Sequence, residues 1–381
     1  MSYDIVVVGA GPAGSTAARV AAEKGLKVAL VERRHRIGFP KQCAEGMNDF
    51  AFQHLKIKPK KEWISNRIDS LYAGCPGKGS VLLKTISLQG YVMERKIFDP
   101  GLADMAVDAG AELFKSTSVE RLEKNNTIVK AQNKTFKTKV VIGADGPNST
   151  ISKQAGLGMP KCGVGLQYEI KAKSDYPNAL QIFFGKYLVK DGYAWIFPKK
   201  NTLNVGLGSY YSHSLIKELN NFVKATGVKG KIIETNGGLI PVHGPLERIY
   251  SKNLMMIGDA AGHTNPTTGG GIPAGMFDGK MAAEIAVKEL ESGRMDFSRY
   301  EKEWKKSIYG KTMKRSLIAQ KYLLKATKAG YVDDFFQKAG DIKLKSIREG
   351  YKLLAKIQNP FAMYYFIMLG TRFLKIHKYA W

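Results

Sequence analysis

The stretch YDIVVVGAGPAGSTAARVAAEKGLKVALVERR (Tyr3–Arg34) decides the fold of this chain. Its β-branched run IVVV is typical of a strand buried on both faces of a parallel sheet. Three glycines follow in the spacing GxGxxG. Gly9 permits a tight turn, Gly11 lets the backbone approach a pyrophosphate, and Gly14 allows a helix to pack closely on the strand. The stretch therefore predicts a strand, a glycine turn and a helix of the kind that binds dinucleotides.

Two neighbouring features support this interpretation. The helix that begins near Pro12 directs its positive dipole end and its unpaired N–H groups at the turn, where phosphates would lie. The second strand, KVALVE, ends at Glu32, whose carboxylate can hold both ribose hydroxyls. We therefore expect an adenine dinucleotide, although this stretch alone does not distinguish FAD from NAD.

Two distant segments favour FAD. In VVIGADGPNSTISKQAG a strand breaks at Asp145 and Gly146 before a helix begins. In NLMMIGDAAGHTNPTTGGGIPAGMFDG a strand ends near Asp259, whose carboxylate can accept a hydrogen bond from a ribityl hydroxyl. The helix that begins near Gly271 and Ile272 can aim its N-terminus at the N1–C2=O edge of a reduced isoalloxazine. A nicotinamide dehydrogenase would not need this second glycine-rich helix start.

The middle of the chain does not continue this pattern. The segments SLYAG, GLQYEIKAK, LQIFFG, YAWIFPKK and TLNVGLGSYY have strand periodicity with turns between them, and they predict an antiparallel sheet that walls a substrate cavity. Tyr193, Trp195 and Phe197 alternate, so their side chains share one face of a strand. Such a stripe is most often core packing, but it also suits an apolar substrate. We expect Tyr193 and Trp195 to contact the substrate and Phe197 to pack in the core.

These patterns predict an α/β fold with a Rossmann-like FAD-binding domain, an inserted antiparallel-sheet substrate domain and a C-terminal helical region. We expect the FAD-binding domain in three parts (1–60, 98–160 and 248–295), the substrate domain in two (61–97 and 161–247), and the helical region at 296–381. No second GxGxxG follows a strand, so we expect no dedicated NAD(P)H domain.

The composition is strongly basic. The chain has 59 Lys and Arg against 33 Asp and Glu, a formal net charge of +26. Such an excess implies an anionic partner, unless it is only a solvated basic surface. No RNA-binding module is recognisable, so an anionic membrane surface is favoured and nucleic acid is not expected. The cysteines Cys43, Cys75 and Cys162 are too few and too scattered for a disulfide framework or a structural zinc site, and we expect no metal.

The last part of the chain concentrates this charge. Residues 301–381 hold 18 Lys and Arg against 6 Asp and Glu. The apolar run PFAMYYFIMLG (Pro360–Gly370) is about half the length that spans a bilayer. Apolar insertion beside basic residues is typical of an interfacial anchor, whereas a helix that closes the substrate cavity is the alternative. We expect no signal peptide and no membrane span, hence a cytoplasmic protein that is peripheral on the membrane.

Several motifs together resemble a known family. GxGxxG with Glu32, the Asp145-Gly146 segment and the segment around Asp259 resemble FAD-dependent proteins of the hydroxybenzoate-hydroxylase fold. Within that group, CAEG, YAWIFPKKNTLNVGLG and GDAAGHTNPTTGGGI resemble the geranylgeranyl reductase family, and most of all the archaeal digeranylgeranylglycerophospholipid reductases. The likeness covers roughly Tyr3 to Asp278, whereas the last hundred residues match only in being helical and basic.

The resemblance and the motifs together imply a site. The expected FAD-binding residues are Gly9, Gly11, Ala13, Gly14, Glu32, Arg33, Cys43, Ala44, Gly46, Arg95, Val119, Asp145, Gly146, Asp259, Gly270, Gly271 and Ile272. The expected substrate-binding residues are Tyr193, Trp195 and Gly206. His263, beside the cofactor motif, is either a loop residue or a catalytic one.

The resemblance places the CAEG segment against the flavin ring. An isolated prenyl alkene carries no carbonyl, so a proton donor must assist hydride transfer from flavin N5. As a hypothesis, the Cys43 thiol is that catalytic donor, or it positions the alkene and a proton-bearing water; an inert buried cysteine is the alternative. Gly46 would let the loop pass close to the ring. Glu45 could tune the thiol, relay the proton or simply face solvent.

The implied function is FAD-dependent saturation of the C=C bonds of geranylgeranyl chains. The implied substrates are digeranylgeranylglycerophospholipids of archaeal-type ether-lipid biosynthesis. The implied partners are this prenylated lipid and an external reductant: ferredoxin, a deazaflavin or NADPH. Two alternatives share the fold: a flavin monooxygenase on an aromatic or quinone substrate, and a membrane-docked electron-relay flavoprotein. Lys153 stands where hydroxylases usually have an arginine, which argues against the monooxygenase.

Overall fold

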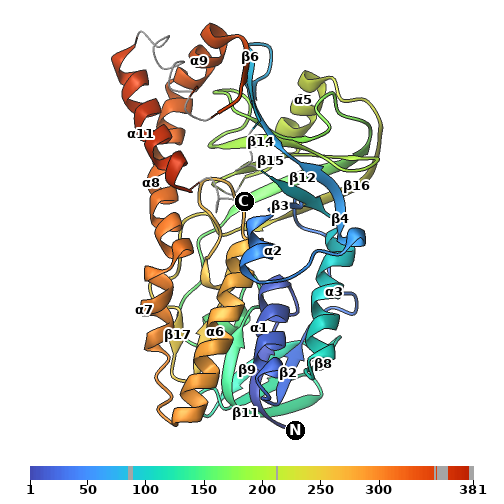
Figure 1. Ribbon diagram of the computed structural model, residues 1–381, viewed down its shortest axis with the longest axis vertical. Coiled ribbons are helices and arrows are strands. Elements are labelled where there is room, and N and C mark those ends of the chain that lie inside the picture. Colours follow the sequence, from blue (N-terminus) through green and yellow to red (C-terminus); the bar gives the residue numbers. More distant parts are fainter. Residues whose placement is uncertain (85–88, 212, 347–348, 350–358, 377–381) are drawn as a thin grey trace.

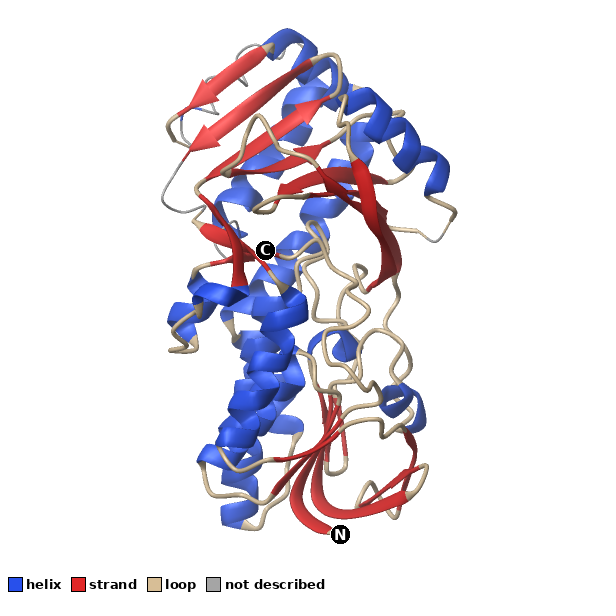
Figure 2. Ribbon diagram, turned by 90° about the vertical axis from the view of Figure 1, so that its right-hand side faces the viewer, coloured by secondary structure: helices blue, strands red, loops and turns tan. Residues whose placement is uncertain are grey.

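A computed structural model describes residues 1–84, 89–211, 213–346, 349 and 359–376 of the chain. The molecule is elongated, with one sheet towards each end and helices α7 (Ser298–Lys306) and α8 (Ile308–Lys328) along one side (Figure 1). The view turned by 90° shows loops between the two sheets, flanked by helices (Figure 2).

The N-terminal sheet is built around the β-branched run. Its strands lie in the order β17 (Tyr250–Ser251), β18 (Leu254–Met256), β11 (Lys134–Gly143), β1 (Ser2–Val8), β2 (Val28–Val31) and β8 (Glu112–Phe114). β1 is parallel to both neighbours, with Ile5 paired to Val140 and to Val28. Ile5 is fully buried, as expected for a central strand covered on both faces. β9 (Val119–Glu123) and β10 (Ile128–Ala131) extend this sheet from β11 with antiparallel pairing.

Helices cover this sheet and set the position of the glycine turn. α1 (Pro12–Glu23) packs between α3 (Arg95–Asp108) and α6 (Ile272–Ser292). α1 and α6 approach so closely that a Cβ atom at Gly279 would lie 2.3 Å from the Ala13 carbonyl oxygen. The short helices α4 (Thr150–Gln154) and η3 (Gly258–Ala261) follow β11 and β18.

The second sheet forms the other end of the molecule. Its strands lie in the order β16 (Lys231–Ile240), β12 (Gly163–Lys171), β15 (Leu203–Ser209), β14 (Gly192–Pro198), β13 (Ala179–Phe183), β5 (Ser70–Cys75), β6 (Gly79–Lys84) and β19 (Asp341–Leu344). The pairings are antiparallel except for two, β13 with β5 and β19 with β6, which are parallel. α5 (Ile216–Thr226) buries Leu219 and Phe222 against this sheet.

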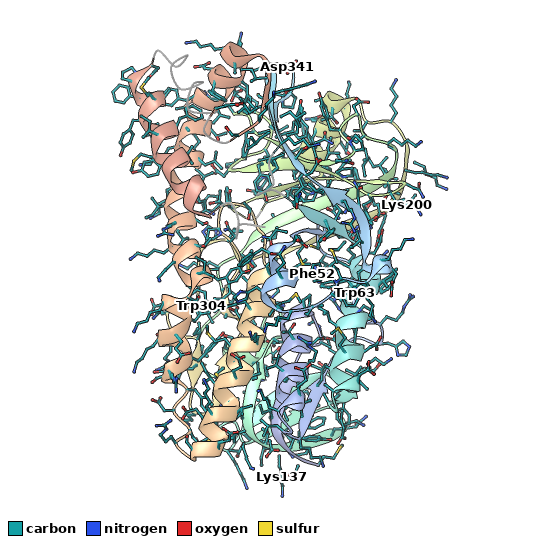
Figure 3. The ribbon with its side chains drawn as sticks, viewed as in Figure 1. Phe52, Trp63, Lys137, Lys200, Trp304 and Asp341 are labelled. Carbon is teal, nitrogen blue, oxygen red and sulfur yellow. The ribbon has the colours of Figure 1, made fainter. Side chains whose placement is uncertain are left out.

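A small sheet joins the two halves. It consists of β3 (Gly46–Asn48), β7 (Gly90–Met93) and β4 (Ile64–Ile68), and the short helices α2 (Phe50–His54) and η1 (Lys61–Trp63) accompany it. Phe52 and Trp63, both labelled in Figure 3, are fully buried in its core together with Phe98 of α3. This core fixes the loop before β3, which contains the CAEG segment.

The C-terminal region is mostly helical, as predicted. α7 and α8 are followed by α9 (Tyr331–Ala339) and α11 (Pro360–Ile376), and α11 packs on α8. One element was not predicted: β19, which starts at Asp341, joins the edge of the second sheet. Within the described residues, no helix is both long enough and apolar enough to cross a bilayer. The predicted fold class is confirmed, whereas the bounds of the six predicted domain segments stay a prediction.

Candidate active site

A cavity of about 630 Å³ lies between the two large sheets. Its lining comes from the carboxyl ends of β1 and β2, from the loop before β3, from the start of α6, and from β12, β14 and β16. The carboxyl ends of parallel strands are where open α/β sheets bind their ligands. The cavity is therefore in the position that the glycine turn predicts for a dinucleotide, with the second sheet as its opposite wall.

The glycine turn has the geometry that phosphate binding requires. Gly9 has a φ of +103°, and a Cβ atom there would lie 2.3 Å from the Ala144 carbonyl oxygen. Gly11 is the N-cap of α1 and no side chain caps this helix start. A Cβ atom at Gly11 would meet nothing within 4 Å, so it would project into open space. The N-terminal N–H groups of α1 are consequently available to an anion.

Glu32 stands beside this turn at the end of β2. Its Oε2 accepts a hydrogen bond from the Ala10 N–H at 2.9 Å, and its Oε1 accepts one from the Arg34 N–H at 2.8 Å. Each carboxylate oxygen keeps a further acceptor site, so the carboxylate can also receive ribose hydroxyls.

A second helix start faces the same cavity. α6 begins at Ile272, directly after Gly271, and again has no side-chain cap. Asp259 lies next to it: a Cβ atom at Gly271 would be 2.9 Å from Asp259 Oδ1, which accepts a hydrogen bond from Thr264 Oγ1 at 2.8 Å. Burial raises the pKa of Asp259. Two uncapped helix N-termini that open into one cavity fit FAD: α1 could hold the pyrophosphate, and α6 could face the flavin pyrimidine.

Asp145 lines the cavity and also stabilises the start of α4 through hydrogen bonds. Its Oδ1 accepts a hydrogen bond from Ser149 Oγ at 2.6 Å, and its Oδ2 accepts one from the Ile151 N–H at 3.2 Å. Burial raises the pKa of Asp145, against the lowering effect of these hydrogen bonds. The carboxylate therefore holds the start of α4 against the cavity.

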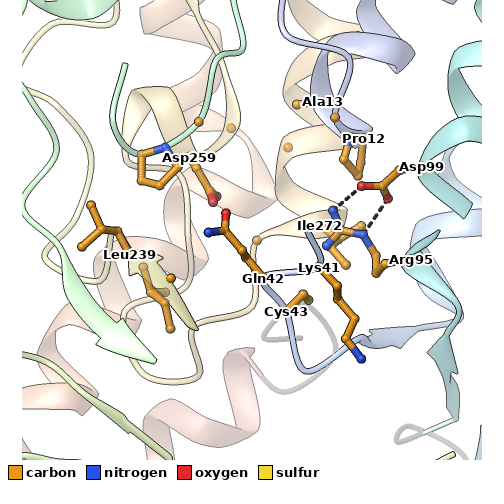
Figure 4. A pocket seen from close by; sticks show the side chains of 18 of the residues that line it. Pro12, Ala13, Lys41, Gln42, Cys43, Arg95, Asp99, Leu239, Asp259 and Ile272 are labelled. Carbon is orange, nitrogen blue, oxygen red and sulfur yellow. Dashed lines mark hydrogen bonds and ion pairs between the residues drawn. The ribbon is translucent and has the colours of Figure 1, made fainter. Parts of the chain in front are cut away.

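The CAEG segment crosses the cavity wall between the two sheets. Cys43 Sγ accepts a hydrogen bond from the Glu45 N–H at 3.1 Å, and the Cys43 carbonyl accepts one from Gln167 Nε2 at 2.8 Å. Arg95 lies beside Cys43 and forms a two-pronged ion pair with Asp99, at 2.6 Å for each contact (Figure 4). Burial raises the pKa of the Cys43 thiol, and the positive charge of Arg95 opposes part of this shift. The thiol is consequently protonated at neutral pH.

Glu45 does not face solvent, which was one of the predicted options. It is fully buried, and its carboxylate contacts Lys41 Nζ at 3.1 Å and Lys199 Nζ at 2.8 Å. Glu169 of β12 pairs with the same Lys41 at 2.5 Å. Sequence reasoning missed Lys41, Lys199 and Glu169. They belong to three separate segments, and in the sequence each resembles an ordinary surface residue.

The aromatic stripe of β14 forms the opposite wall. Tyr193, Trp195 and Phe197 all line the cavity, although core packing was expected for Phe197. Phe197 in fact does both, since it also packs against a small cluster of buried residues. The Trp195 indole donates to Gln167 Oε1 at 3.1 Å, and the Tyr193 hydroxyl donates to the Thr268 carbonyl. These hydrogen bonds hold the rings against the wall.

The structure gathers most of the predicted residues at this cavity. Those that line it are Gly9, Gly11, Ala13, Glu32, Arg33, Cys43, Ala44, Gly46, Arg95, Val119, Asp145, Gly146, Tyr193, Trp195, Asp259, Gly270, Gly271 and Ile272. Figure 4 shows Cys43 near Arg95, and Gln42 pointing towards Asp259.

Two predicted residues do not line the cavity. A Cβ atom at Gly14 would lie 1.9 Å from the Gly9 carbonyl oxygen, so this glycine serves the close packing of α1. Gly206 lies behind Trp195, and a Cβ atom there would be 2.6 Å from the indole. We expected Gly206 to contact the substrate. The structure instead gives it an indirect role, because the absence of a side chain there leaves room for the Trp195 ring.

His263 is not part of the cavity lining either. It is fully buried and stacks on Trp304 of α7, with 3.7 Å between the ring centroids (Trp304 is labelled in Figure 3). Asp278 of α6 lies 2.7 Å from His263 Nδ1, accepts a hydrogen bond from Trp304 Nε1 at 2.8 Å, and accepts another from the Gly258 N–H at 3.0 Å. This cluster anchors the loop that carries Asp259.

The glycine turn, the two uncapped helix starts and the second sheet define an FAD-dependent oxidoreductase. A family model described as FAD dependent oxidoreductase matches residues 4–151. A second, described as geranylgeranyl reductase catalytic domain, matches residues 162–240, and a third, described as lycopene cyclase protein, matches residues 209–351.

The relatives identify the family. The chain is 37% identical over 350 residues to digeranylgeranylglycerophospholipid reductase 2 of Methanothermobacter thermautotrophicus, with 85% of this chain and 88% of that protein covered. It is 35% identical over 372 residues to the digeranylgeranylglycerophospholipid reductase of Methanosarcina acetivorans, with 91% and 90% covered. The chain belongs to the geranylgeranyl reductase family.

Solved structures agree. A geranylgeranyl bacteriochlorophyll reductase-like protein of Thermoplasma acidophilum superposes with a TM-score of 0.84 at 29% identity, over 96% of this chain and 99% of that one. A probable FAD-dependent monooxygenase of Pseudomonas aeruginosa superposes with a TM-score of 0.67 at 13% identity, over 88% and 99%. The second likeness shows the shared fold alone.

Proposed function

We propose that this enzyme saturates the isolated C=C bonds of geranylgeranyl chains, and that its substrate is digeranylgeranylglycerophospholipid in the synthesis of archaeal-type ether lipids. The observation that carries this proposal is the meeting of three features in one cavity: the Cys43 thiol, the aromatic wall of β14 and the uncapped start of α6. An apolar chain suits the wall, and the thiol is an acid that is compatible with it. The names of the relatives support the same substrate.

The chain's own residues divide the chemistry between them. FAD, when bound and reduced, would supply the hydride for one alkene carbon. Cys43 donates its proton to the neighbouring carbon, so each C=C bond gains two hydrogens, and the thiolate is then reprotonated by water. The aromatic wall excludes water from the reacting carbons, because Trp195 and Tyr193 are fixed by hydrogen bonds. Arg95 faces the thiolate that is left after proton transfer and stabilises its charge.

Two electrons must return to the flavin after each cycle. We infer that they come from an external donor, namely ferredoxin, a deazaflavin or NADPH. The GxGxxG turn between β1 and α1 is the one dinucleotide-binding motif recognised in the sequence, and FAD would occupy it. A nicotinamide donor would therefore bind only transiently.

We also infer that α11 attaches the enzyme to an anionic membrane surface. Phe361, Tyr364 and Ile367 recur every three residues and share one face of the helix, where 69%, 51% and 41% of their respective surfaces are exposed. The basic residues of 301–381 supply attraction to anionic headgroups. Aromatic and aliphatic side chains beside such charge favour insertion at the bilayer interface.

Mass spectrometry of lipids tests the proposed reaction. The protein is expressed in a host that makes unsaturated archaeal-type ether lipids, and the lipids are compared with those of cells that carry an empty vector. The expected result is a mass gain in steps of two hydrogens per double bond. Addition of oxygen would instead identify a monooxygenase, and unchanged lipids together with a flavin that accepts electrons would identify a relay protein.

A further inference from the structure

A buried ionic cluster lies directly behind the loop before β3 that contains Cys43, Ala44 and Glu45, which we call the catalytic loop because of the role proposed for Cys43. We define it as Lys41, Glu45, Glu169 and Lys199, together with the amide of Asn204. Its members come from the loop before β3, from β12, from the residue after β14, and from β15. Lys41 is 2% exposed, Glu45 is 0% exposed and Asn204 is 0% exposed. The cluster therefore ties the N-terminal half of the cavity wall to the second sheet.

Glu45 is the centre of this cluster. Its Oε2 accepts from Lys41 Nζ at 3.1 Å, from Lys199 Nζ at 2.8 Å and from Asn204 Nδ2 at 2.9 Å. Its Oε1 accepts from the Arg95 N–H, the first of α3, at 2.9 Å. A carboxylate buried in this way stays charged only because such donors replace its water shell.

The same cluster determines the backbone of the catalytic loop. Glu45 has a φ of +74°, in the left-handed region that a glutamate rarely adopts. This conformation turns the Glu45 N–H onto Cys43 Sγ at 3.1 Å. Asn204 Nδ2 also donates to the Ala44 carbonyl at 3.0 Å. The backbone on both sides of the strained residue is thus fixed by polar contacts, as a rare conformation requires.

We propose that Glu45, Lys41 and Lys199 are positioning residues, which hold the Cys43–Gly46 turn so that the Cys43 thiol points at the reacting alkene beside Arg95. This inference rests on the proposed function of Cys43. Glu45 could either position the loop or relay a proton. A proton relay requires a carboxyl group that can be protonated. Both Glu45 oxygens are occupied by donors, two of which are ammonium groups. The neighbouring lysines accordingly lower the pKa of Glu45, in spite of its burial.

The test uses the purified FAD-containing protein and three variants. Lys199→Met removes one ammonium group, Lys199→Arg restores a cation, and Glu45→Gln/Lys199→Gln removes one charge of each sign and keeps the cluster neutral. Lys139→Met is the matched control, because Lys139 forms an exposed pair with Asp4 at 2.8 Å and neither residue lines the cavity. The readouts are FAD absorbance, kcat and KM for lipid reduction, and the rate of Cys43 alkylation by iodoacetamide against pH, followed on the Cys43 peptide.

Positioning predicts a specific combination of results. In Lys199→Met the FAD content and the KM are expected to stay within about twofold of the parent, whereas kcat falls at least tenfold. Cys43 is expected to be alkylated several-fold faster at a given pH, since the loosened loop admits water to the thiol. Lys199→Arg recovers most of the kcat, and Lys139→Met behaves as the parent. Should Lys199→Met fail to fold, the charge-balanced double variant is expected to show the same loss of kcat and the same faster alkylation.

Two results would overturn the proposal. The first is an alkylation profile and a kcat that both match the parent. The second is a lost kcat with an unchanged alkylation profile, which is what a proton relay through Glu45 would give. If the parent protein reduces no lipid at all, the proposed function fails, whereas the alkylation comparison still decides whether the cluster positions Cys43.

Discussion

Gly206 and Trp195 are neighbours on paired strands, and the indole of Trp195 occupies the place where a side chain at position 206 would stand. A Cβ atom at Gly206 would lie 2.6 Å from the ring and 2.5 Å from the Cβ of Gln167. The wall of the cavity therefore depends on a residue that does not itself line the cavity. Because Gln167 holds both the indole and the Cys43 carbonyl, a change at position 206 reaches the aromatic wall and the catalytic loop together.

Gly206→Ala is expected to displace the Trp195 ring. Overpacking of this kind costs about 1–3 kcal/mol of unfolding free energy, and we expect slower lipid reduction with FAD retained. Thermal unfolding and FAD absorbance measure the two effects. Gly208→Ala is the matched control on the same strand, because its Cβ atom would lie 3.4 Å from Trp195, an ordinary contact. Equal losses in both variants would contradict the role assigned to Gly206.

The glycine turn offers a second matched pair. Gly11→Ala is expected to leave the stability of the FAD-free protein unchanged, since the new methyl group meets nothing within 4 Å. It should weaken FAD binding by about tenfold or more, ~1.4 kcal/mol, because the pyrophosphate must approach this backbone. Gly9→Ala should destabilise the FAD-free protein as well, owing to its φ of +103° and a 2.3 Å contact. Titration with FAD and thermal unfolding of the stripped proteins distinguish these outcomes, and full FAD affinity in Gly11→Ala would refute the placement of the pyrophosphate.

The pH dependence of lipid reduction follows from the thiol. A general acid works only while it is protonated, and burial raises the pKa of Cys43 above the ordinary thiol value of 9.0. Turnover should therefore stay constant through neutral pH and fall only above about pH 9 as the thiol ionises. The measurement is single-turnover reduction by pre-reduced enzyme, so that the electron donor imposes no pH dependence of its own. A decline that begins below pH 7 would exclude the Cys43 thiol as the titrating acid.

The membrane surface can be tested separately from the chemistry. Replacing Phe361, Tyr364 and Ile367 by serine should abolish flotation with anionic vesicles, because the apolar face of α11 is lost while the fold is kept. Reduction of a short prenyl alcohol that needs no membrane should be unchanged. Ile97→Ser is the control, since Ile97 is similarly exposed (46%) but lies on α3. Unaltered flotation of the triple variant would show that another surface binds the membrane.

Sequence reasoning succeeded where a function depends on local pattern. The turn at Gly9, the helix start at Ile272 and the alternation through Trp195 are each contained in one short segment, so backbone geometry follows from spacing. The parallel strand β19 could not be predicted, because its partner β6 lies more than 250 residues earlier in the chain.

The ionic cluster behind Cys43 was hidden for the same reason. Lys41, Glu169 and Lys199 belong to three separate segments, and the residue type alone does not reveal whether a lysine is buried or exposed. Only the packing of the second sheet onto the loop before β3 brings these charges together. Likewise, Gly206 was expected to contact the substrate. The residue is a glycine because its position is crowded, but the group that crowds it is the Trp195 ring.

An anaerobic single turnover tests the proposed reaction most directly. FAD-containing protein is reduced with dithionite, freed of excess reductant and mixed with digeranylgeranylglycerophospholipid, while flavin absorbance and lipid mass are followed together. The lipid is expected to gain two hydrogens for each flavin reoxidised. Cys43→Ala is expected to bind FAD normally but to react at least about 10²-fold more slowly. Reduced flavin that persists beside unchanged lipid, or a Cys43→Ala variant as fast as the parent, would contradict the proposed reaction.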